Sequence, residues 1–287
     1  MSILVNAETR VVIQGITGSI GRYVSHRMKA CRDANLVAGV TPGKGGEYVE
    51  GVPVFDTVYE AVNEARADTG LIFVPAARAP GAIIEAADAG LGLVIVYSEG
   101  VPVSDAARAI DYAAYKNMRV IGPNAAGVAS PGEANVSELD NAWLRKGTIG
   151  IVSKSGTLTY DVLKFASNYK GVSTVVCLGG DVIPGTRVDE VLPMFENDRE
   201  TELVILLGEI GGVDEIIAAD YVKKMKKPVA AYICGIHAPR EKPMGHAGAI
   251  QSRHSDTAAA KSEALKAAGA KTAGTRAELF DIVSRIM

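Results

Sequence analysis

Short apolar runs that alternate with helical stretches constrain the fold of this 287-residue chain more than any other feature. In the first half, each run ends in a polar, glycine-rich or proline-containing turn, and Ala-rich stretches such as Ala79–Ala89 and Ala106–Lys116 are expected to be helices. Strands that alternate with helices predict a parallel, doubly wound sheet. Residues 1–123 are therefore expected to form one Rossmann-like domain. Its expected strands are Arg10–Gln14, Leu36–Val40, Leu71–Val74, Leu93–Tyr97 and Arg119–Ile121.

The same alternation begins again in the second half. Residues 124–146, which Pro131 and Gly132 punctuate, are expected to be a connecting segment rather than part of a sheet. The chain is long enough for two cores, so residues 147–287 are predicted to form a second α/β domain. Its expected strands are Thr148–Val152, Val172–Leu178, Leu203–Leu207 and Val229–Ile233.

Glycines follow the first predicted strand with the spacing Gly15-x-x-Gly18-x-x-Gly21, before a helix expected to end near Arg32. This pattern is typical of a turn that binds phosphate at a helix N-terminus, although many such turns are only tight packing corners. An NAD site would need an acidic residue about 20 residues later. The second strand instead leads into a glycine-rich loop that contains Lys44. A lysine there suits the extra phosphate of NADP or the 3′-phosphate of coenzyme A, or it is a solvated loop residue.

Hydroxyl side chains gather where the strand Thr148–Val152 is expected to lead into a helix, at Ser153, Ser155, Thr157 and Thr159. Such a turn suits both an N-cap and a phosphate-binding loop. Capping accounts for one of the two serines but not for four hydroxyl residues in seven positions. The turn is therefore a candidate phosphate site.

His246 lies between the small residues Gly245 and Ala247, in a loop that follows the predicted strand Val229–Ile233. Glu209 follows another predicted strand and precedes two glycines. Ligands of open α/β sheets gather at the carboxyl ends of strands. Both residues are therefore candidates for chemistry, against the alternatives of a histidine packed in a turn and an exposed loop glutamate.

Composition and absent motifs exclude several classes of protein. A net charge of −3 gives no reason to expect nucleic acid or an anionic membrane as a partner. The three cysteines, Cys31, Cys177 and Cys234, are scattered, so we expect a reducing, cytoplasmic location and no metal site. We expect neither a signal peptide nor a membrane span. The sequence lacks a Gly-Lys-Ser/Thr P-loop, HExxH and GxSxG, which leaves an ATPase, a zinc protease and a hydrolase of those families unsupported.

Seven motifs, in order along the whole chain, resemble the alpha subunit of succinyl-CoA synthetase (succinate–CoA ligase), an acid–thiol ligase. They are Gly15-Ile16-Thr17-Gly18, Val40-Thr41-Pro42-Gly43-Lys44-Gly45-Gly46, Ser98-Glu99-Gly100, Gly122-Pro123-Asn124, Ser153-Lys154-Ser155-Gly156-Thr157-Leu158-Thr159-Tyr160, Gly208-Glu209-Ile210-Gly211-Gly212 and Gly245-His246-Ala247-Gly248-Ala249-Ile250. The resemblance implies an α/β fold, with an N-terminal Rossmann-like CoA-binding domain and a C-terminal flavodoxin-like ligase domain.

The resemblance also implies a role for each motif. His246 would be the phosphorylated histidine and Glu209 its carboxylate partner. The phosphate would be received by Ser153, Ser155, Gly156 and Thr157. CoA would lie along Thr17, Gly18, Ser19, Ile20, Lys44, Tyr97, Ser98 and Glu99. ATP or GTP with Mg²⁺ would be bound mainly by a beta subunit of the ATP-grasp type, in an αβ or α2β2 heteromer.

Three segments depart from the usual pattern of that family. Ala125-Ala126-Gly127 stands where Cys-Pro-Gly is usual, 136–146 lacks the usual Gly/Met/Pro character, and 251–256 replaces a Gly/Lys-rich stretch. Asn124, Ala125 and Ala126 are expected to contact the acid, so the sequence leaves succinate, malate and sulfoacetate open. An NADP-dependent oxidoreductase and a non-enzymatic CoA-binding regulatory module are the alternative functions.

Overall fold

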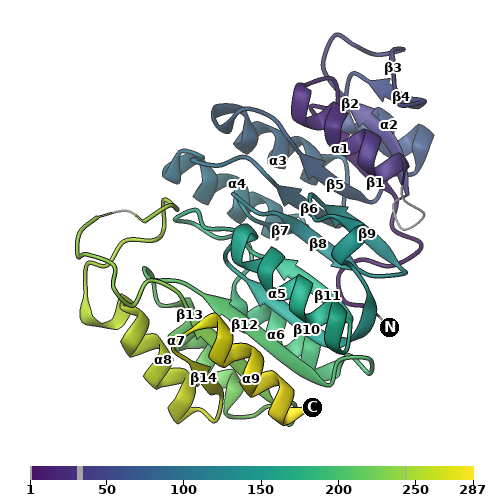
Figure 1. The fold of residues 1–287 in the computed structure, drawn as a ribbon. Helices are drawn as coiled ribbons and strands as arrows, with labels where there is room; N and C mark the ends of the chain where they lie inside the picture. Colours follow the sequence, from purple (N-terminus) through teal and green to yellow (C-terminus); the bar gives the residue numbers. More distant parts are fainter. Residues whose placement is uncertain (1, 31–34, 243) are drawn as a thin grey trace.

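A computed structural model describes residues 2–30, 35–242 and 244–287, and it contains two seven-stranded sheets, one from each half of the chain (Figure 1). The strands of the first sheet are β1 (Val11–Gln14), β2 (Leu36–Val40), β3 (Tyr48–Val49), β4 (Val52–Phe55), β5 (Thr69–Ile72), β6 (Leu93–Val96) and β7 (Arg119–Ile121). Their order is β3-β4-β2-β1-β5-β6-β7, and only the short β3 pairs in an antiparallel sense. The six parallel strands have the 3-2-1-4-5-6 order of a Rossmann sheet. The prediction of a Rossmann-like first domain is confirmed.

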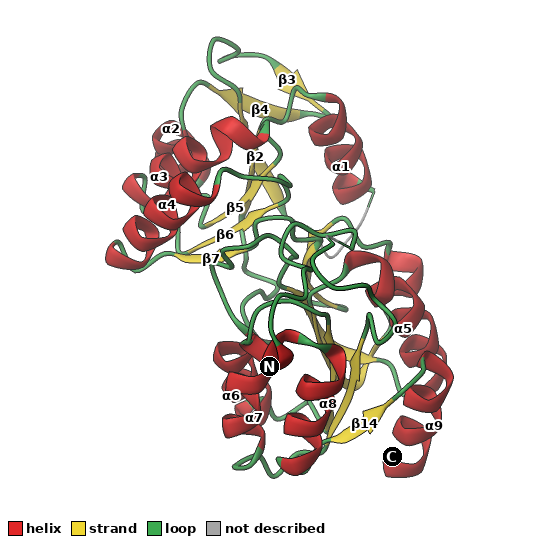
Figure 2. Cartoon of the chain, turned by 90° about the vertical axis from the view of Figure 1, so that its left-hand side faces the viewer, coloured by secondary structure: helices red, strands yellow, loops and turns green. Residues whose placement is uncertain are grey.

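Helices cover both faces of this sheet (Figure 2). They are α1 (Ser19–Lys29), α2 (Val58–Ala65), α3 (Ala79–Asp88) and α4 (Val103–Tyr115), with a short 3₁₀ turn η1 (Ala76–Arg78) before α3. In Figure 2, α1 lies on one face of the sheet and α2 to α4 lie on the other. Helix α1 ends at Lys29; Arg32, its expected end, lies outside the described residues. The strand order reverses between β1 and β5, which are parallel, so the turn after β1 opens at the point where such sheets bind ligands.

The second sheet contains β8 (Gly127–Ser130), β9 (Ala134–Ser137), β10 (Lys146–Ser153), β11 (Val172–Cys177), β12 (Leu203–Gly208), β13 (Val229–Ile233) and β14 (Lys271–Ala273). Its order is β14-β13-β12-β10-β11-β8-β9. The five parallel strands β10 to β14 have the 2-1-3-4-5 order of flavodoxin. The prediction of a flavodoxin-like second domain is confirmed. Its helices are α5 (Gly156–Tyr169), α6 (Val188–Asn197), α7 (Asp214–Val222), α8 (Ala258–Ala267) and α9 (Arg276–Ile286), with 3₁₀ turns η2 (Asn141–Trp143) and η3 (His254–Asp256).

The segment 124–146 differs from its expected role as a connection. Two of its stretches are strands, and β8 pairs antiparallel with β11 and with β9. The strands are only four residues long and carry polar side chains such as Asn135 and Ser137, which hides them from a search for apolar runs. Those polar groups are buried and bonded to each other, as in the contact of the Ser137 hydroxyl with the Asn135 side chain. The segment is thus the antiparallel edge of the second sheet.

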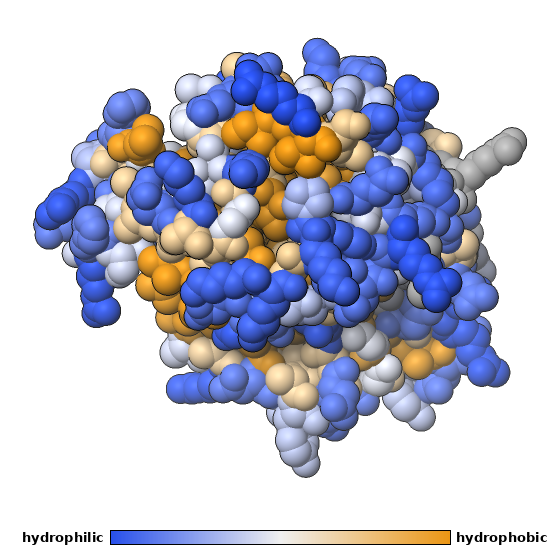
Figure 3. Space-filling model, turned by 90° about the horizontal axis from the view of Figure 1, so that it is seen from below, coloured by the Kyte–Doolittle hydropathy of each residue, from blue (hydrophilic) through white to orange (hydrophobic). Residues whose placement is uncertain are grey.

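Buried apolar residues from both halves join in one core cluster, which includes Ile13 and Ile95 from the first sheet and Val152 and Leu206 from the second. The apolar core is therefore continuous between the two domains. Seen from below, the surface is mainly hydrophilic, with smaller apolar areas between the charged side chains (Figure 3). None of the described helices has the length and apolar character needed to cross a membrane.

Candidate active site

Glu209 follows β12 directly and is only 3% exposed. Its backbone is fixed from two sides, because its N–H donates to Oε1 of Glu215 (3.1 Å) and its carbonyl oxygen accepts from Nζ of Lys261 (2.8 Å). Lys261 and Glu215 also pair with each other and are fully buried. The alternative of an exposed loop glutamate is therefore wrong, and the carboxylate of Glu209 is held in one place.

The loop after β13 brings His246 to this carboxylate. Nδ1 of His246 lies 2.6 Å from Oε2 of Glu209. The histidine side chain keeps 25% of its surface exposed, whereas that of Glu209 keeps 4%. A carboxylate that accepts from Nδ1–H fixes the tautomer in which Nε2 carries the free lone pair. The geometry presents Nε2 of His246 as a nucleophile.

The charges around the ring act on its protonation. The hydrogen bond that His246 donates to Glu209 raises the pKa of His246 above its ordinary value. Burial opposes this, and the charges of Glu209 and Glu99 raise the pKa further. The positive charge of Lys154 lowers the pKa of His246. The same carboxylate that orients the ring therefore also stabilises its cationic form.

Lys154 is a buried cation that the sequence analysis did not single out. Its Nζ lies 3.1 Å from Oδ2 of Asp214. Burial lowers the pKa of Lys154, but the nearby charges of Glu215, Asp214 and Glu209 outweigh burial and hold the pKa above its usual range. Lys154 therefore stays charged and partly balances the carboxylates behind the histidine.

The hydroxyl-rich turn after β10 begins helix α5, and most of its hydroxyls are used inside the turn. Ser155 is the N-cap, and its side chain accepts from the N–H of Leu158 (3.3 Å). The Ser153 hydroxyl bonds to the backbone of Ser155, and the Thr159 hydroxyl donates to the Ser155 carbonyl oxygen. Capping thus accounts for Ser155 alone, as expected, but other hydrogen bonds inside the turn use the hydroxyls of Ser153 and Thr159.

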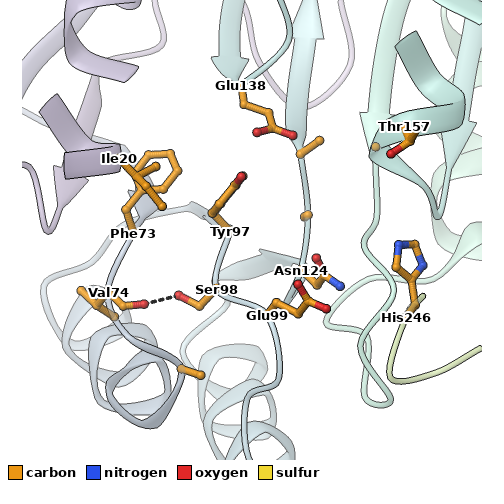
Figure 4. Close-up of a pocket in the computed structure, with 14 residues that line it drawn as sticks. Ile20, Phe73, Val74, Tyr97, Ser98, Glu99, Asn124, Glu138, Thr157 and His246 are labelled. Atoms are coloured by element: carbon orange, nitrogen blue, oxygen red, sulfur yellow. Dashed lines mark hydrogen bonds between the residues drawn. The ribbon is translucent and has the colours of Figure 1, made fainter. Parts of the chain in front are cut away.

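One cavity of about 350 Å³ joins the two domains at this point (Figure 4). Ten residues that the sequence marked as candidates line it: Ile20, Tyr97, Ser98, Glu99, Asn124, Ala125, Ala126, Gly156, Thr157 and His246. In Figure 4, His246 and Thr157 lie on one side of the cavity, and Ile20 and Phe73 lie on the opposite side. The start of α5 and the candidate nucleophile therefore share a cavity with the turns of the first domain.

The other candidate residues lie outside the lining of this cavity. Ser153 is the last residue of β10, Ser155 is the N-cap of α5, and Glu209 follows β12; none of the three lines the cavity. Thr17, Gly18 and Ser19 form the turn into α1, where the Thr17 hydroxyl contacts that of Thr41 (3.1 Å). Lys44 is exposed, and its Nζ lies 2.9 Å from Oε1 of Glu47.

Four further residues line the cavity that the sequence analysis missed: Phe73, Val74, Ala76 and Glu138. Glu138 follows β9 and lies in the segment 136–146 that departs from the family pattern. A methyl group added at Gly156 would lie 3.7 Å from Oε1 of Glu138, so this carboxylate is next to the start of α5. Burial and the nearby charge of Glu138 raise the pKa of Tyr97 to about 12. The unusual character of 136–146 was the available signal for Glu138.

Comparison with known proteins agrees with this arrangement. Residues 6–100 match the family model of the CoA binding domain, and residues 152–271 match that of the CoA-ligase. Over its full length the chain is 49% identical to the succinate–CoA ligase [ADP-forming] subunit alpha of Aquifex aeolicus, of which it covers 95%. The chain belongs to the family of succinate–CoA ligase alpha subunits. The acid–thiol ligase class and the use of CoA follow from this membership, which also favours a ligase over an NADP-dependent oxidoreductase.

Other members of the family match over similar lengths. The chain is 46% identical to the subunit alpha 2 of Archaeoglobus fulgidus, with full coverage of both chains. It is 44% identical to the alpha subunit of Staphylococcus aureus, over 97% of this chain and 93% of that one.

Solved structures support the fold. An ATP citrate lyase of Methanosaeta concilii superposes with a TM-score of 0.89 at 24% identity, over 99% of this chain and 50% of that one. A dinucleotide-forming acetyl-coenzyme A synthetase of Ca. Korarchaeum cryptofilum gives a TM-score of 0.78 at 20% identity, over 96% of this chain and 60% of that one. At these identities the similarity is one of fold.

Proposed function

We propose that His246 carries a phosphoryl group from a nucleoside triphosphate to a small carboxylic acid, in an ADP- or GDP-forming acid–CoA ligase. The observation that carries this proposal is the contact of His246 with Glu209 at the edge of a cavity that both domains line. Nε2 would attack the γ-phosphorus, and the nucleoside diphosphate would leave. Glu209 would stabilise the positive charge that develops on the ring during the attack.

The start of α5 is the proposed receiver of the phosphoryl group. Gly156 and Thr157 are the first two residues of the helix and line the cavity. N–H groups at a helix start point along the axis towards an anion. The helix dipole adds only about 0.3–1 kcal/mol at an exposed end, so the directed hydrogen bonds contribute more. Ser153 and Ser155 would act indirectly, because their hydroxyls shape the turn.

The remaining steps need an acid and CoA. An oxygen of the acid would attack the phosphorus of phosphohistidine, which releases neutral His246 and gives an acyl phosphate. The CoA thiolate would then attack the acyl carbon and expel inorganic phosphate. In this proposal, CoA extends from Lys44 and the turn at Thr17, Gly18 and Ser19 into the cavity. Asn124, Ala125 and Ala126 would contact the acid.

The proposal includes a second subunit. The relatives are named as alpha subunits, and the sequence contains no Gly-Lys-Ser/Thr P-loop. We propose that a beta subunit of the ATP-grasp type binds the nucleotide with Mg²⁺, in an αβ or α2β2 heteromer. A cytoplasmic location, where nucleotides and CoA are available and Cys177 and Cys234 stay free thiols, is part of the same proposal.

Phosphorylation of His246 tests the proposal directly. The assembled enzyme is incubated with γ-labelled ATP or GTP and Mg²⁺, without CoA, and the protein is examined for a phosphate that is labile in acid and stable in base. We expect His246→Ala to lose the label and His254→Ala, a matched change of an exposed histidine in the same loop, to keep it. Label that survives in His246→Ala contradicts the mechanism. A wild-type enzyme that binds CoA but never takes up label indicates a regulatory module instead.

A further inference from the structure

The segment 179–181, which one residue separates from β11, lies between three turns that carry proposed site residues. A methyl group added at Gly179 would lie 2.1 Å from the carbonyl oxygen of Pro123, and one added at Gly180 would lie 2.2 Å from Nδ1 of His246. Contacts this short leave room for no side chain at either position. The segment therefore touches the turn that carries Asn124 and the imidazole ring at the same time.

The next residue, Asp181, reaches the first domain. Its Oδ1 accepts the N–H of Gly100 (3.2 Å), and its Oδ2 accepts the N–H of Val101 (3.0 Å). These two residues end the turn after β6 that also carries Ser98 and Glu99. Asp181 is 8% exposed. Hydrogen bonds to an ionised acceptor are about twice as strong as neutral ones, so a buried carboxylate with two of them holds this turn firmly.

The other side of the same segment holds the histidine loop. The carbonyl oxygen of Gly180 accepts the N–H of Gly248 (2.9 Å), two residues after His246. Gly180 and Asp181 thus connect the turn of Ser98 and Glu99, which we call the CoA turn, to the loop of the proposed nucleophile. Asp181 itself does not line the cavity, so it acts through the groups that it holds.

We propose that Asp181 is a positioning residue that keeps the turn of Ser98 and Glu99 in a fixed position relative to the loop of His246. This inference rests on the proposed function, because it assigns CoA to that turn. Asp181 should therefore affect the two half-reactions, phosphorylation of His246 and transfer of the phosphoryl group to the acid with thioester formation, to different extents. Phosphorylation of His246 by nucleotide does not need the turn of Ser98 and Glu99. Transfer to the acid and formation of the thioester need both this turn and the loop of His246.

The two half-reactions are compared in Asp181→Asn and in a control, Thr186→Val. Asparagine replaces one accepting oxygen by an N–H₂ group and removes the charge. The control removes another buried bond between the same domains, from the Thr186 hydroxyl to the Val120 carbonyl oxygen (2.7 Å), which reaches neither the CoA turn nor the histidine loop. The measurements are single-turnover labelling of His246 and CoA-dependent discharge of the label in the presence of acid.

We expect Asp181→Asn to raise the KM for CoA in the discharge step about tenfold, as for the loss of one bond to a charged group. Its labelling rate should stay within about threefold of wild type, and Thr186→Val should leave both steps nearly unchanged. A purely structural role would slow labelling and discharge equally, or would affect both variants alike. Either result, or an unchanged KM for CoA, would overturn the proposal.

Amide hydrogen exchange separates this inference from the proposed function, because it needs no reaction. In Asp181→Asn, exchange should quicken at Gly100 and Val101 and also at Gly248, and in Thr186→Val it should not. Unchanged exchange at Gly248 overturns the link even if the ligase reaction is intact. Absence of label in the wild-type enzyme overturns the proposed function, while the exchange result still decides whether Asp181 joins the two loops.

Discussion

Lys261 and Glu215 form an ion pair in which neither side chain is exposed, directly behind the backbone of Glu209. Each member of the pair also bonds to that backbone, Lys261 through the carbonyl oxygen and Glu215 through the N–H. The position of the proposed catalytic carboxylate therefore depends on a charge pair that never meets solvent or substrate.

Lys261→Met should destabilise the protein by about 3–5 kcal/mol, because it leaves the charge of Glu215 buried and uncompensated. The free energy of unfolding from denaturant titration is the measurement. The matched control is Lys223→Met, which breaks an exposed pair with Asp220 and should cost no more than about 0.5 kcal/mol. The double variant with Glu215→Leu should recover much of the loss. Equal effects of the two lysine changes would contradict this account.

The pH dependence of phosphorylation should follow the raised pKa of His246. Only the neutral ring is a nucleophile, so the labelling rate should rise with pH and reach half its maximum above pH 6.5, the ordinary value for histidine. In Glu209→Gln the main cause of the shift is removed, so the midpoint should move to lower pH. The maximum rate should fall about a hundredfold or more, because the tautomer is no longer fixed.

The contact of His246 with Glu209 also makes the stability of the folded protein depend on pH. Because the folded pKa of His246 lies above its unfolded value, the ion pair with Glu209 stabilises the protein fully below about pH 6.5. This contribution is lost as pH rises through the folded pKa. A Glu209→Gln variant whose labelling midpoint equals that of wild type would show that another group sets the profile.

Gly180→Ala should abolish most of the phosphorylation of His246. The added methyl group would lie 2.2 Å from Nδ1, where the ring now meets Glu209, so the ring must move away from the carboxylate. A displacement of about 1 Å costs roughly a hundredfold in rate. Gly81→Ala is the control, since a methyl group there meets no atom within 4 Å and lies on the exposed side of α3. Normal labelling of Gly180→Ala would show that the ring is not confined as described.

Sequence reasoning found the strand-end residues because alternating strands and helices place such turns at one edge of a sheet. Glu209 and His246 are far apart in sequence, yet their strands β12 and β13 are neighbours, which brings them into contact. Asp181 lies four residues after the end of the buried strand β11, whereas Glu209 follows β12 directly, so the strand-end argument did not single out Asp181.

What the sequence could not supply was the direction of individual side chains. The serines of the Ser153–Thr159 turn looked like ligands for phosphate, but their hydroxyls bond within the turn. Glu138 follows the short strand β9, whose polar side chains interrupt any apolar run that could have revealed it. Its place beside Gly156 depends on how β9 and α5 pack.

The contribution of Lys44 to CoA binding can be measured apart from the histidine. If its ammonium meets a phosphate of CoA, Lys44→Ala should raise the KM for CoA and leave labelling of His246 nearly normal. The lysine is exposed and already paired with Glu47, so we expect the lower part of the range for a charged contact, about tenfold. Glu47→Gln is the control and should lower that KM or leave it unchanged. An unchanged KM in Lys44→Ala returns the residue to a solvated loop lysine.

The walls of the cavity lead to a prediction about the acid. Ala126 has a backbone N–H that the proline usual in the family lacks. The carbonyl oxygen of Ala126 accepts the N–H of Glu138 (2.9 Å), so a backbone hydrogen bond holds these two residues next to each other. An oxygen added to the acid can therefore meet a donor at Ala126 and an acceptor at Glu138. We expect the best acid to carry an added hydroxyl or a sulfonate, with kcat/KM for malate or sulfoacetate above that for succinate by about tenfold.

Glu138→Gln distinguishes the two candidate acids. A hydroxyl of malate can donate to the carboxylate of Glu138, whereas a sulfonate would meet it as a like charge. Loss of the charge should therefore raise kcat/KM for sulfoacetate relative to malate, by about threefold to tenfold for a partly solvated pair. Glu133→Gln, a change on the same edge of the second sheet but outside the cavity lining, is the control. If succinate is the best acid by tenfold or more in wild type, and Glu138→Gln leaves the order unchanged, neither residue selects the acid.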